Sequence, residues 1–282
     1  MGLLQKAVNT YSCHQNLVGK IIEGHCVLAP VSHIVTNSDF EILIDKDGSF
    51  ISATKLDKTE PKILIPVTES SAGRTSAPCA HPLCEQIGYL TSKNEEKYCL
   101  YTKQLEAWAN SAFSHPKLNP ILTYVKKDSV ISDLVRSKII SLDSKGLPLK
   151  DKQIVRWRVL GCGEPSACWE DISLMDSFIS WYADLRSKNS RDLCYITGMI
   201  DVPAEQHAKG IVPVNGNAKL ISSNDSSGFT YRGRFIEPEQ AASISYEASQ
   251  KAHNALRWLI AEQGQQIIFG GRTFLCWNPE GI

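Results

Sequence analysis

A tight hairpin between residues 40 and 53 is the sequence feature that most constrains the fold. The apolar run Phe40–Ile44 leads into Asp45-Lys-Asp-Gly48, and a second β-prone run, Ser49-Phe-Ile-Ser-Ala53, follows. Asp-Gly between two such runs favours a hairpin because glycine adopts positive φ at little steric cost. The pattern therefore predicts antiparallel β-structure early in the sequence.

Helical and strand patterns alternate irregularly along the rest of the chain. Without regular βαβ alternation, we expect an α+β fold with mixed and antiparallel sheets and interspersed helices. We divide it into two α+β parts, 1–125 and 126–282, or one continuous domain. Residues 69–82 are expected to form a polar loop. Apolar periodicity predicts helices over Leu3–Tyr11, within 84–113, along the face Ile172, Met175, Ile179 and Tyr182, and from Pro238 through Ala242, Tyr246, Ser249, Ala252, Leu256 and Ile260 to a C-cap at Gly264. Further strands are expected at Ile63–Ile65 and Gln153–Leu160, with a second hairpin at 266–277.

The charge balance limits the kinds of partner. The 282 residues carry 30 Lys and Arg against 30 Asp and Glu, a formal net charge of zero. A protein that binds duplex DNA or membrane by bulk charge is usually strongly basic. No apolar run approaches the roughly 18 residues of a transmembrane helix. The nine scattered cysteines, without a Cys-x-x-Cys pair, fit reduced thiols in a cytoplasm.

Positive charge is concentrated in residues 126–158. Nine Lys and Arg residues face four Asp there, a local net charge of +5, and the next segment, 164–176, is acidic. Such a stretch suits contact with phosphates, and a plain solvated surface is the alternative. The basic residues are Lys126, Lys127, Arg136, Lys138, Lys145, Lys150, Lys152, Arg156 and Arg158.

Three polar segments carry groups that suit nucleic acid. Gly73-Arg74-Thr75-Ser76 combines a flexible backbone, a guanidinium and two hydroxyls, which suit phosphates and groove edges. Residues 215–224 offer amides, a lysine and hydroxyls through Asn215, Asn217, Lys219 and Asn224. Residues 229–235 interleave aromatics with Arg232 and Arg234, a combination that holds unpaired bases. A surface strand with solvated arginines is the alternative for this last segment.

Enzyme signatures are sparse. The sequence has no Gly-x-Ser-x-Gly, no His-Glu-x-x-His and no phosphate-binding P-loop. Cys79-x-His81-x2-Cys84 is a candidate half of a zinc site, with Cys162 and Cys168 as a second half, but the spacing is unusual for zinc. Glu170-Asp171 is explained by a helix start, where negative charge is favourable.

A series of motifs in fixed order resembles a known family. Cys194-Tyr-Ile-Thr-Gly198 is followed by His207-Ala-Lys-Gly210, then Leu220-Ile-Ser-Ser-Asn224, then Gly228-Phe-Thr-Tyr-Arg-Gly233. This order resembles the large subunit of type I-C CRISPR Cascade complexes, the Csd family of Cas proteins. Met199, Ser223 and Arg232 depart from the family pattern. The family is about twice this length, so the chain resembles its N-terminal portion or a shortened homologue.

The resemblance implies a function without catalysis, cofactor or metal. A large subunit of this kind recognises the protospacer-adjacent motif in double-stranded DNA, separates the strands and starts the R-loop in a prokaryotic cytoplasm. Its partners are target DNA, the guide RNA ribonucleoprotein, other Cascade subunits and a recruited helicase-nuclease, with no membrane. Two alternatives remain: a module that docks on Cascade backbone subunits without reading DNA, and a zinc-dependent enzyme. The implied DNA-binding residues are Gly73, Arg74, Thr75, Ser76, Lys150, Lys152, Arg156, Arg158, Asn215, Asn217, Lys219, Asn224, Arg232 and Arg234.

Overall fold

The chain divides into two compact units that do not follow a single cut in the sequence. The computed structural model describes residues 2–212, 216, 218–221, 243–264 and 268–278. One unit, called the sheet unit below, is residues 33–182, and the other, the helix-pair unit, joins residues 1–32 to 183–282. The boundary expected at 125/126 falls inside the sheet unit. Strands from either side of that position pair in one sheet.

A mixed three-stranded sheet forms the centre of the sheet unit. Its order is β3 (Phe50–Lys55), β2 (Phe40–Ile44) and β5 (Val155–Val159), with β2 antiparallel to β3 and parallel to β5. The β2–β3 hairpin confirms the Asp-Gly prediction. Gly48 has φ +69°, and a Cβ at this glycine would meet the carbonyl oxygen of Pro120 at 2.6 Å. Only glycine therefore fits this turn.

The sheet has one apolar and one charged face. Ile42 and Trp157, which are register partners, are fully buried on the apolar face. Helix α4 (Leu118–Lys126) provides Tyr124, whose ring meets Trp157 edge-to-face. The opposite face carries Glu41, Arg156 and Arg158, because successive residues of a strand point to opposite sides.

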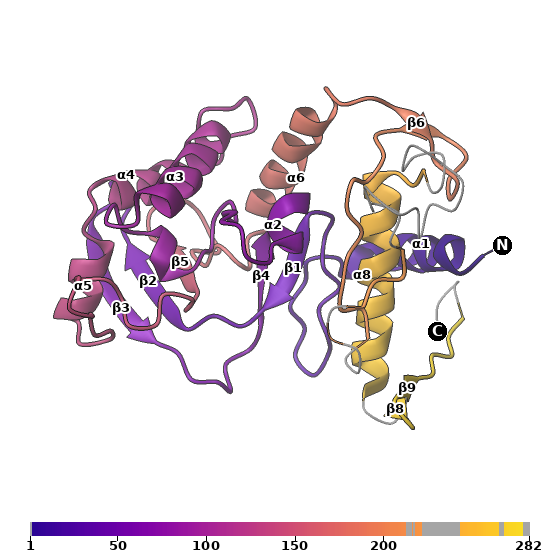
Figure 1. Ribbon diagram of the computed structural model, residues 1–282, viewed down its shortest axis with the longest axis horizontal. Coiled ribbons are helices and arrows are strands. Elements are labelled where there is room, and N and C mark those ends of the chain that lie inside the picture. The colour runs from indigo at the N-terminus through magenta and orange to yellow at the C-terminus, as the bar shows by residue number, and fades with distance from the viewer. Residues whose placement is uncertain (1, 213–215, 217, 222–242, 265–267, 279–282) are drawn as a thin grey trace. The chain divides into compact units, whose positions relative to one another are not determined.

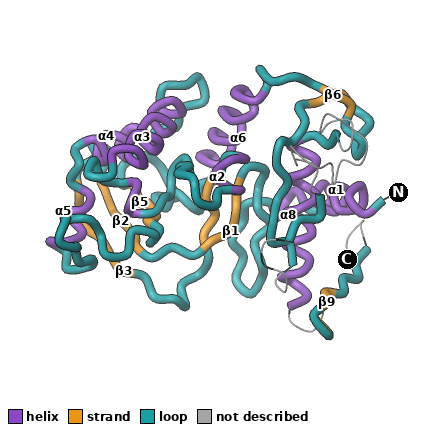
Figure 2. The backbone as a smooth tube through the Cα atoms, in the orientation of Figure 1, coloured by secondary structure: helices purple, strands orange, loops and turns teal. Residues whose placement is uncertain are grey.

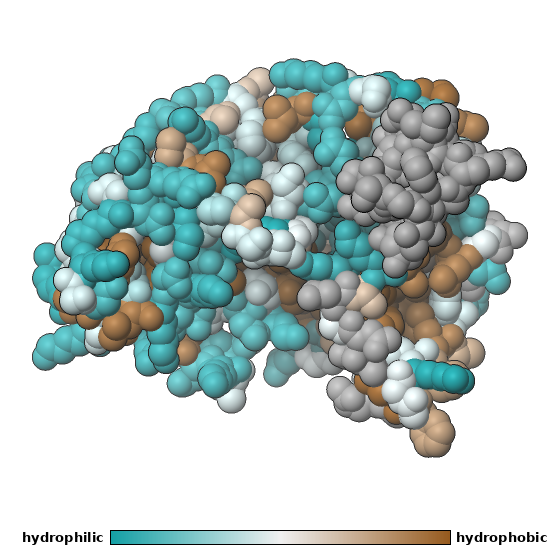
Figure 3. Space-filling model, in the orientation of Figure 1, coloured by the Kyte–Doolittle hydropathy of each residue, from teal (hydrophilic) through white to brown (hydrophobic). Residues whose placement is uncertain are grey.

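The sheet unit contains further elements beside this sheet (Figures 1 and 2). They are β1 (His33–Thr36) paired with β4 (Ile63–Pro66), α2 (Glu69–Gly73), the 3-10 turn η2 (Ile87–Tyr89), α3 (Glu95–Ala109), α5 (Val130–Arg136) and α6 (Ile172–Arg186), whose last residues count with the helix-pair unit. On the face drawn in Figure 3, hydrophilic residues predominate over α3 and α4.

Two predictions in this unit need correction. The expected loop 69–82 begins with helix α2, because the hydroxyl of Thr68 accepts the backbone N–H of Ser71 and caps it. The helix expected within 84–113 begins only at Glu95. The backbone before it bonds to another segment instead: Ile87 N donates to Gln153 O, and Val155 N donates to Glu85 O.

In the helix-pair unit, α1 (Leu3–Cys13) packs against α8 (Tyr246–Gln263). Ala7 and Tyr11 of α1 join Ala252, Ala255 and Leu256 of α8 in one buried cluster. The unit also contains η1 (Gln15–Leu17) and two short hairpins, β6 (Asp192–Leu193) with β7 (Ile200–Asp201) and β8 (Ile268–Phe269) with β9 (Arg272–Thr273). No helix in the described part of the chain is long and apolar enough to cross a bilayer.

Helix α8 confirms its predicted apolar face and corrects its predicted start. The face from Tyr246 to Ile260 is buried, and Gly264 ends the helix with φ +66°. The helix begins at Tyr246 rather than Pro238, because the hydroxyl of Ser245 accepts the backbone N–H of Ala248 as an N-cap. Pro238 and Ala242 lie outside the described residues. The second predicted hairpin is confirmed in a shorter form as β8–β9.

Candidate nucleic-acid interface

Arg74 follows helix α2 and lies in an internal ion pair. Its Nη1 is 2.6 Å from Glu85 Oε2 and its Nη2 is 2.9 Å from Oε1, a bidentate geometry. Nη1 also donates to the carbonyl oxygen of Cys79. Burial would lower the pKa of Arg74, but the hydrogen bonds and charge of Glu85 raise it above its ordinary value. The predicted DNA-contacting guanidinium is thus already neutralised, while Thr75 and Ser76 beside it are exposed.

Glu85 organises the segment around Arg74. It is fully buried, and its carboxylate also accepts the backbone N–H groups of His81 at 2.5 Å and Gln86 at 2.6 Å. A carboxylate with this many donors is well compensated for the loss of water. Glu85 therefore fixes both sides of the 74–86 segment and the guanidinium between them.

Tyr89 connects this segment to the basic stretch. Its hydroxyl accepts the backbone N–H of Cys79, and the guanidinium of Arg74 lies 5.4 Å from its ring centroid. The ammonium group of Lys97 lies 5.5 Å from the same centroid and 3.0 Å from Asp151 Oδ2. These contacts bring the predicted 73–76 segment and the predicted Lys150–Lys152 segment together.

Three exposed lysines lie on or beside residues 146–152. Lys150 and Lys152 are exposed, and within the described residues neither makes an ion pair. Lys93, also exposed, donates to the carbonyl oxygen of Gly146 at 3.3 Å and so lies beside the same loop. We call Thr75, Ser76, Lys93, Lys150 and Lys152 the lysine surface. Its hydroxyls and ammonium groups are available to phosphate oxygens.

Arg156 and Arg158 are held on the charged face of the sheet. Arg156 Nε donates to Glu41 Oε2 at 2.9 Å, and Arg158 Nε donates to Glu41 Oε1 at 2.7 Å. Both guanidinium groups stack over Trp169, at 4.0 and 5.0 Å from its ring centroid. Arg156 is buried, so Glu41 and Trp169 hold its guanidinium within the protein.

The predicted residues of the helix-pair unit are only partly described. Lys219 is half-exposed and lies opposite Lys209 in an isolated antiparallel bridge. Asn215, Asn217, Asn224, Arg232 and Arg234 lie outside the described residues. Gly73, in the sheet unit, ends helix α2.

The candidate zinc residues are occupied by other roles. His81 Nδ1 lies 3.0 Å from Ser71 Oγ, and burial, with a smaller effect of Arg74, lowers the pKa of His81 to about 3. Burial raises the pKa of Cys84 to about 12, which disfavours the thiolate that metals bind. Among the described residues, no group of three or more His, Cys, Asp or Glu side chains is arranged to hold a metal ion.

A Ser–His–Asp cluster at the start of α6 has the wrong orientation for nucleophilic catalysis. His115 Nδ1 accepts the backbone N–H of Lys117, so Nε2 carries the proton of the neutral ring and donates to Ser173 Oγ. Ser173 Oγ in turn donates to Asp171 Oδ1 at 2.6 Å. Asp171 also caps the helix and pairs with the buried ammonium group of Lys117. The imidazole therefore cannot take a proton from Ser173 in this arrangement.

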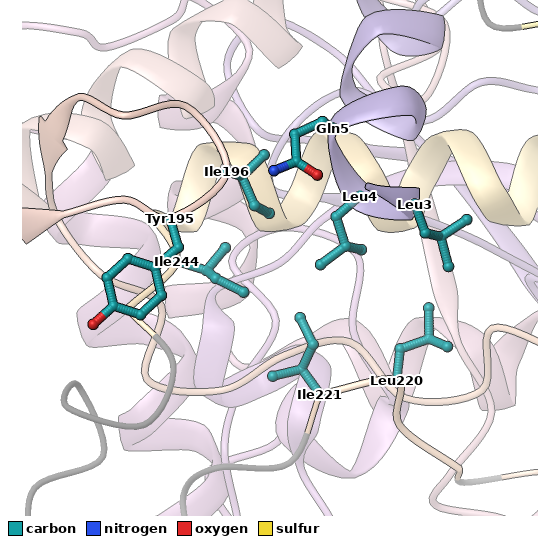
Figure 4. A pocket seen from close by; sticks show the side chains of 8 residues that line it. All are labelled: Leu3, Leu4, Gln5, Tyr195, Ile196, Leu220, Ile221 and Ile244. Atoms are coloured by element: carbon teal, nitrogen blue, oxygen red, sulfur yellow. The ribbon is translucent and has the colours of Figure 1, made fainter. Parts of the chain in front are cut away.

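A separate apolar pocket of about 420 Å³ opens in the helix-pair unit (Figure 4). Leu3 and Leu4 of α1 point toward Leu220 and Ile221 across it. Leu3 and Leu220 are each about half exposed. The other residues that line it are Gln5, Tyr195, Ile196 and Ile244.

Sequence reasoning missed the residues that organise the candidate interface. Glu41 and Trp169 gave no local signal, because their partners lie elsewhere in the chain. Lys93 and Lys97 could have been included as basic residues near the start of a helix. Their closeness to Asp151 depends on the bonds between residues 87–88 and 151–153.

The chain matches one protein family over nearly its whole length. The family model described as CRISPR-associated protein (Cas_Csd1) covers residues 8–281, including both compact units. A search of curated proteins finds no match to this sequence. The match confirms the resemblance read from the motifs between Cys194 and Gly233. The chain therefore belongs to the Csd1 family of CRISPR-associated proteins.

Proposed function

We propose that this chain binds double-stranded target DNA as the large subunit of a type I-C Cascade complex, recognises the protospacer-adjacent motif and starts the R-loop. One observation carries the DNA contact: Tyr89, Lys97 and Asp151 link the 73–76 segment to the exposed lysines. Membership of the Csd1 family supports the assembly. In such complexes, pairing with the guide RNA supplies most of the sequence specificity, and the protein reads only a short motif. The same division of labour is known for Cas9, a protein of a different class, and is used here as an analogy.

The lysine surface provides the sequence-independent part of binding. Each phosphate neutralised by a lysine releases condensed counterions, so affinity falls with salt in proportion to the number of neutralised phosphates. Thr75 and Ser76 supply hydroxyls that can reach base edges. Arg156 and Arg158 are assigned a supporting role here, because Glu41 already neutralises part of their charge.

The test is the salt dependence of duplex binding by the assembled complex. Lys150→Ala with Lys152→Ala should reduce the slope of log K against log salt by about 0.9 for each phosphate that the lysines no longer neutralise. Lys58→Ala with Lys62→Ala is the matched control, because both lysines are exposed in the same unit and outside the lysine surface. An unchanged slope in the first pair would remove these lysines from the DNA interface.

Motif reading needs a separate measurement. Thr75→Val with Ser76→Ala removes two hydroxyls from exposed positions, and the preference for a motif-bearing duplex over a motif-scrambled duplex should fall. Equal preference in the variant and the parent complex would place motif reading elsewhere.

The pocket favours a second candidate function, docking on another Cascade subunit. Its exposed apolar side chains suit a protein surface more than a nucleic-acid backbone. Leu220→Asp places a charge at a half-exposed position, and the variant should be incorporated poorly into the complex. Normal incorporation would place subunit docking on another surface.

A further inference from the structure

The β8–β9 hairpin exposes two phenylalanines. Phe269 is 79% exposed and Phe274 is 58% exposed. The hairpin turns at Gly270-Gly271, whose φ angles are 56° and 72°. Two consecutive positive φ values form the turn that best matches the twist of a two-residue hairpin. Figure 1 shows it beside the C-terminal end of α8.

The register places the aromatic rings and an arginine on one side of this hairpin. Phe269 pairs directly with Arg272, and Ile268 pairs with Thr273. The exposed residues Arg272, Phe274 and Cys276 alternate with the half-buried residues Thr273, Leu275 and Trp277. Since alternate residues of an extended chain face opposite sides, Phe269, Arg272 and Phe274 share the outward side. We call these three residues the aromatic hairpin face.

The inward side anchors the hairpin to the helix-pair unit. Leu275 and Trp277 pack against the buried cluster of α1 and α8. Trp277 Nε1 donates to Thr10 Oγ1 at 2.9 Å, and Gln263 Nε2 donates to the carbonyl oxygen of Cys276 at 2.8 Å. These contacts therefore hold the hairpin against α1 and α8 while its aromatic hairpin face points outward.

Alternation in a surface strand normally buries apolar residues and exposes polar ones. In residues 272–277 exposed and half-buried residues still alternate, but the exposed side of the hairpin contains phenylalanines. The two exposed rings on one side of the hairpin, with a guanidinium between them in the register, form a surface suited to binding.

We propose that the aromatic hairpin face binds unpaired bases of single-stranded nucleic acid, with Phe269 and Phe274 stacking on bases and Arg272 contacting phosphate or a base plane. The inference rests on the proposed function, which requires separated strands. Flat aromatic rings beside a guanidinium are the combination that holds single strands without sequence preference. Paired bases inside a duplex do not offer their faces in this way. An apolar protein partner would gain little from the exposed Arg272 between the rings.

Photo-crosslinking in the assembled complex tests the proposal. The probe is a 5-iodouracil oligonucleotide that is not complementary to the guide, so base pairing with the guide does not hold it. We expect crosslinked peptide from residues 268–277, together with single-strand binding that is about ten-fold weaker in Phe269→Ala/Phe274→Ala for each base that is no longer stacked. Phe269→Tyr/Phe274→Tyr keeps the rings and should retain affinity.

Met199→Ala/Ile200→Ala is the matched control. Both side chains are exposed apolar residues on the other hairpin of the same unit, and their removal should leave single-strand binding unchanged. Unchanged single-strand affinity in Phe269→Ala/Phe274→Ala, with no crosslink to 268–277, would overturn the proposal. Poor incorporation into the complex with single-strand affinity unchanged would also overturn it, since the hairpin would then dock protein. The salt slope of duplex binding through Lys150 and Lys152 is independent, so failure here is separable from failure of the proposed function.

Discussion

Two arginines of strand β5 and two lysines just before it belong to one basic stretch of the sequence, but their surroundings differ. The arginines are Arg156 and Arg158, and the lysines are Lys150 and Lys152. The arginines stack on Trp169 and share the carboxylate of Glu41. The lysines are exposed. A planar guanidinium fits a carboxylate and an aromatic ring at once, whereas an ammonium on a flexible stem stays hydrated. The local net charge of the sequence therefore overstates the positive charge that is available to a binding partner.

Arg74 is paired as well, with Glu85. Substitution of Glu85 is expected to cause the largest loss of stability. Glu85→Ala leaves the mostly buried guanidinium of Arg74 without its counterion and should lower the free energy of unfolding by about 3–5 kcal/mol. Urea denaturation measures this. Glu96→Ala, at an exposed position on α3, is the control and should change stability by less than about 0.5 kcal/mol. Equal values for the two variants would contradict the assignment of Arg74 as a structural residue.

A smaller loss of stability is expected on the charged face of the sheet. Glu41→Gln keeps the side-chain shape but removes the charge that Arg156 and Arg158 share, and should cost about 2 kcal/mol. The same denaturation assay applies. Glu60→Gln is the comparison, because Glu60 is 3.6 Å from Arg156 and its side chain is 43% exposed. If the two substitutions cost the same, Glu41 is not the main partner.

Acid should weaken the arginine cluster, because its carboxylate partner becomes protonated. Burial would raise the pKa of Glu41, but hydrogen bonds from Arg158 and Arg156 outweigh it and hold the pKa below 4.5. Because the folded state favours the charged form, this stabilisation is complete above about pH 4.5 and is lost as the pH falls through the lower folded pKa. The stability difference between the parent protein and Glu41→Gln should therefore narrow in acid. A difference that is constant down to about pH 3 would contradict this explanation.

The lysines should contribute least to stability. Lys150→Ala/Lys152→Ala is expected to change the free energy of unfolding by no more than about 0.5 kcal/mol, since neither side chain is buried. Thermal melting of the variant measures this, with the salt slope of DNA binding as the functional counterpart. A decrease above about 1 kcal/mol would mean that these lysines have a structural partner and would weaken the contrast with the arginines.

Local sequence patterns predicted many of the helices and strands, but few of the contacts between side chains. The Asp-Gly turn, strand β5 and the buried face of α8 followed from short-range spacing, because turns and amphipathic faces are set by near neighbours. The start of α8 and the beginning of α3 did not, since a serine cap and backbone bonds to residues 151–155 decide them. The 73–76 and 150–152 segments were both selected from sequence, but only the contacts of Tyr89 and Lys97 show that they belong together.

The amino-acid sequence alone determined the α+β class, the main hairpin, the basic stretch and the resemblance to the Csd family, since each depends on residue order and local spacing. Tertiary structure decided which cations are neutralised. Glu41 lies 115 residues before Arg156 in the chain and meets it because β2 and β5 pair in parallel register. Charge is a property of composition, but its availability depends on distance and burial, because Coulomb attraction and desolvation act between atoms that only folding brings together.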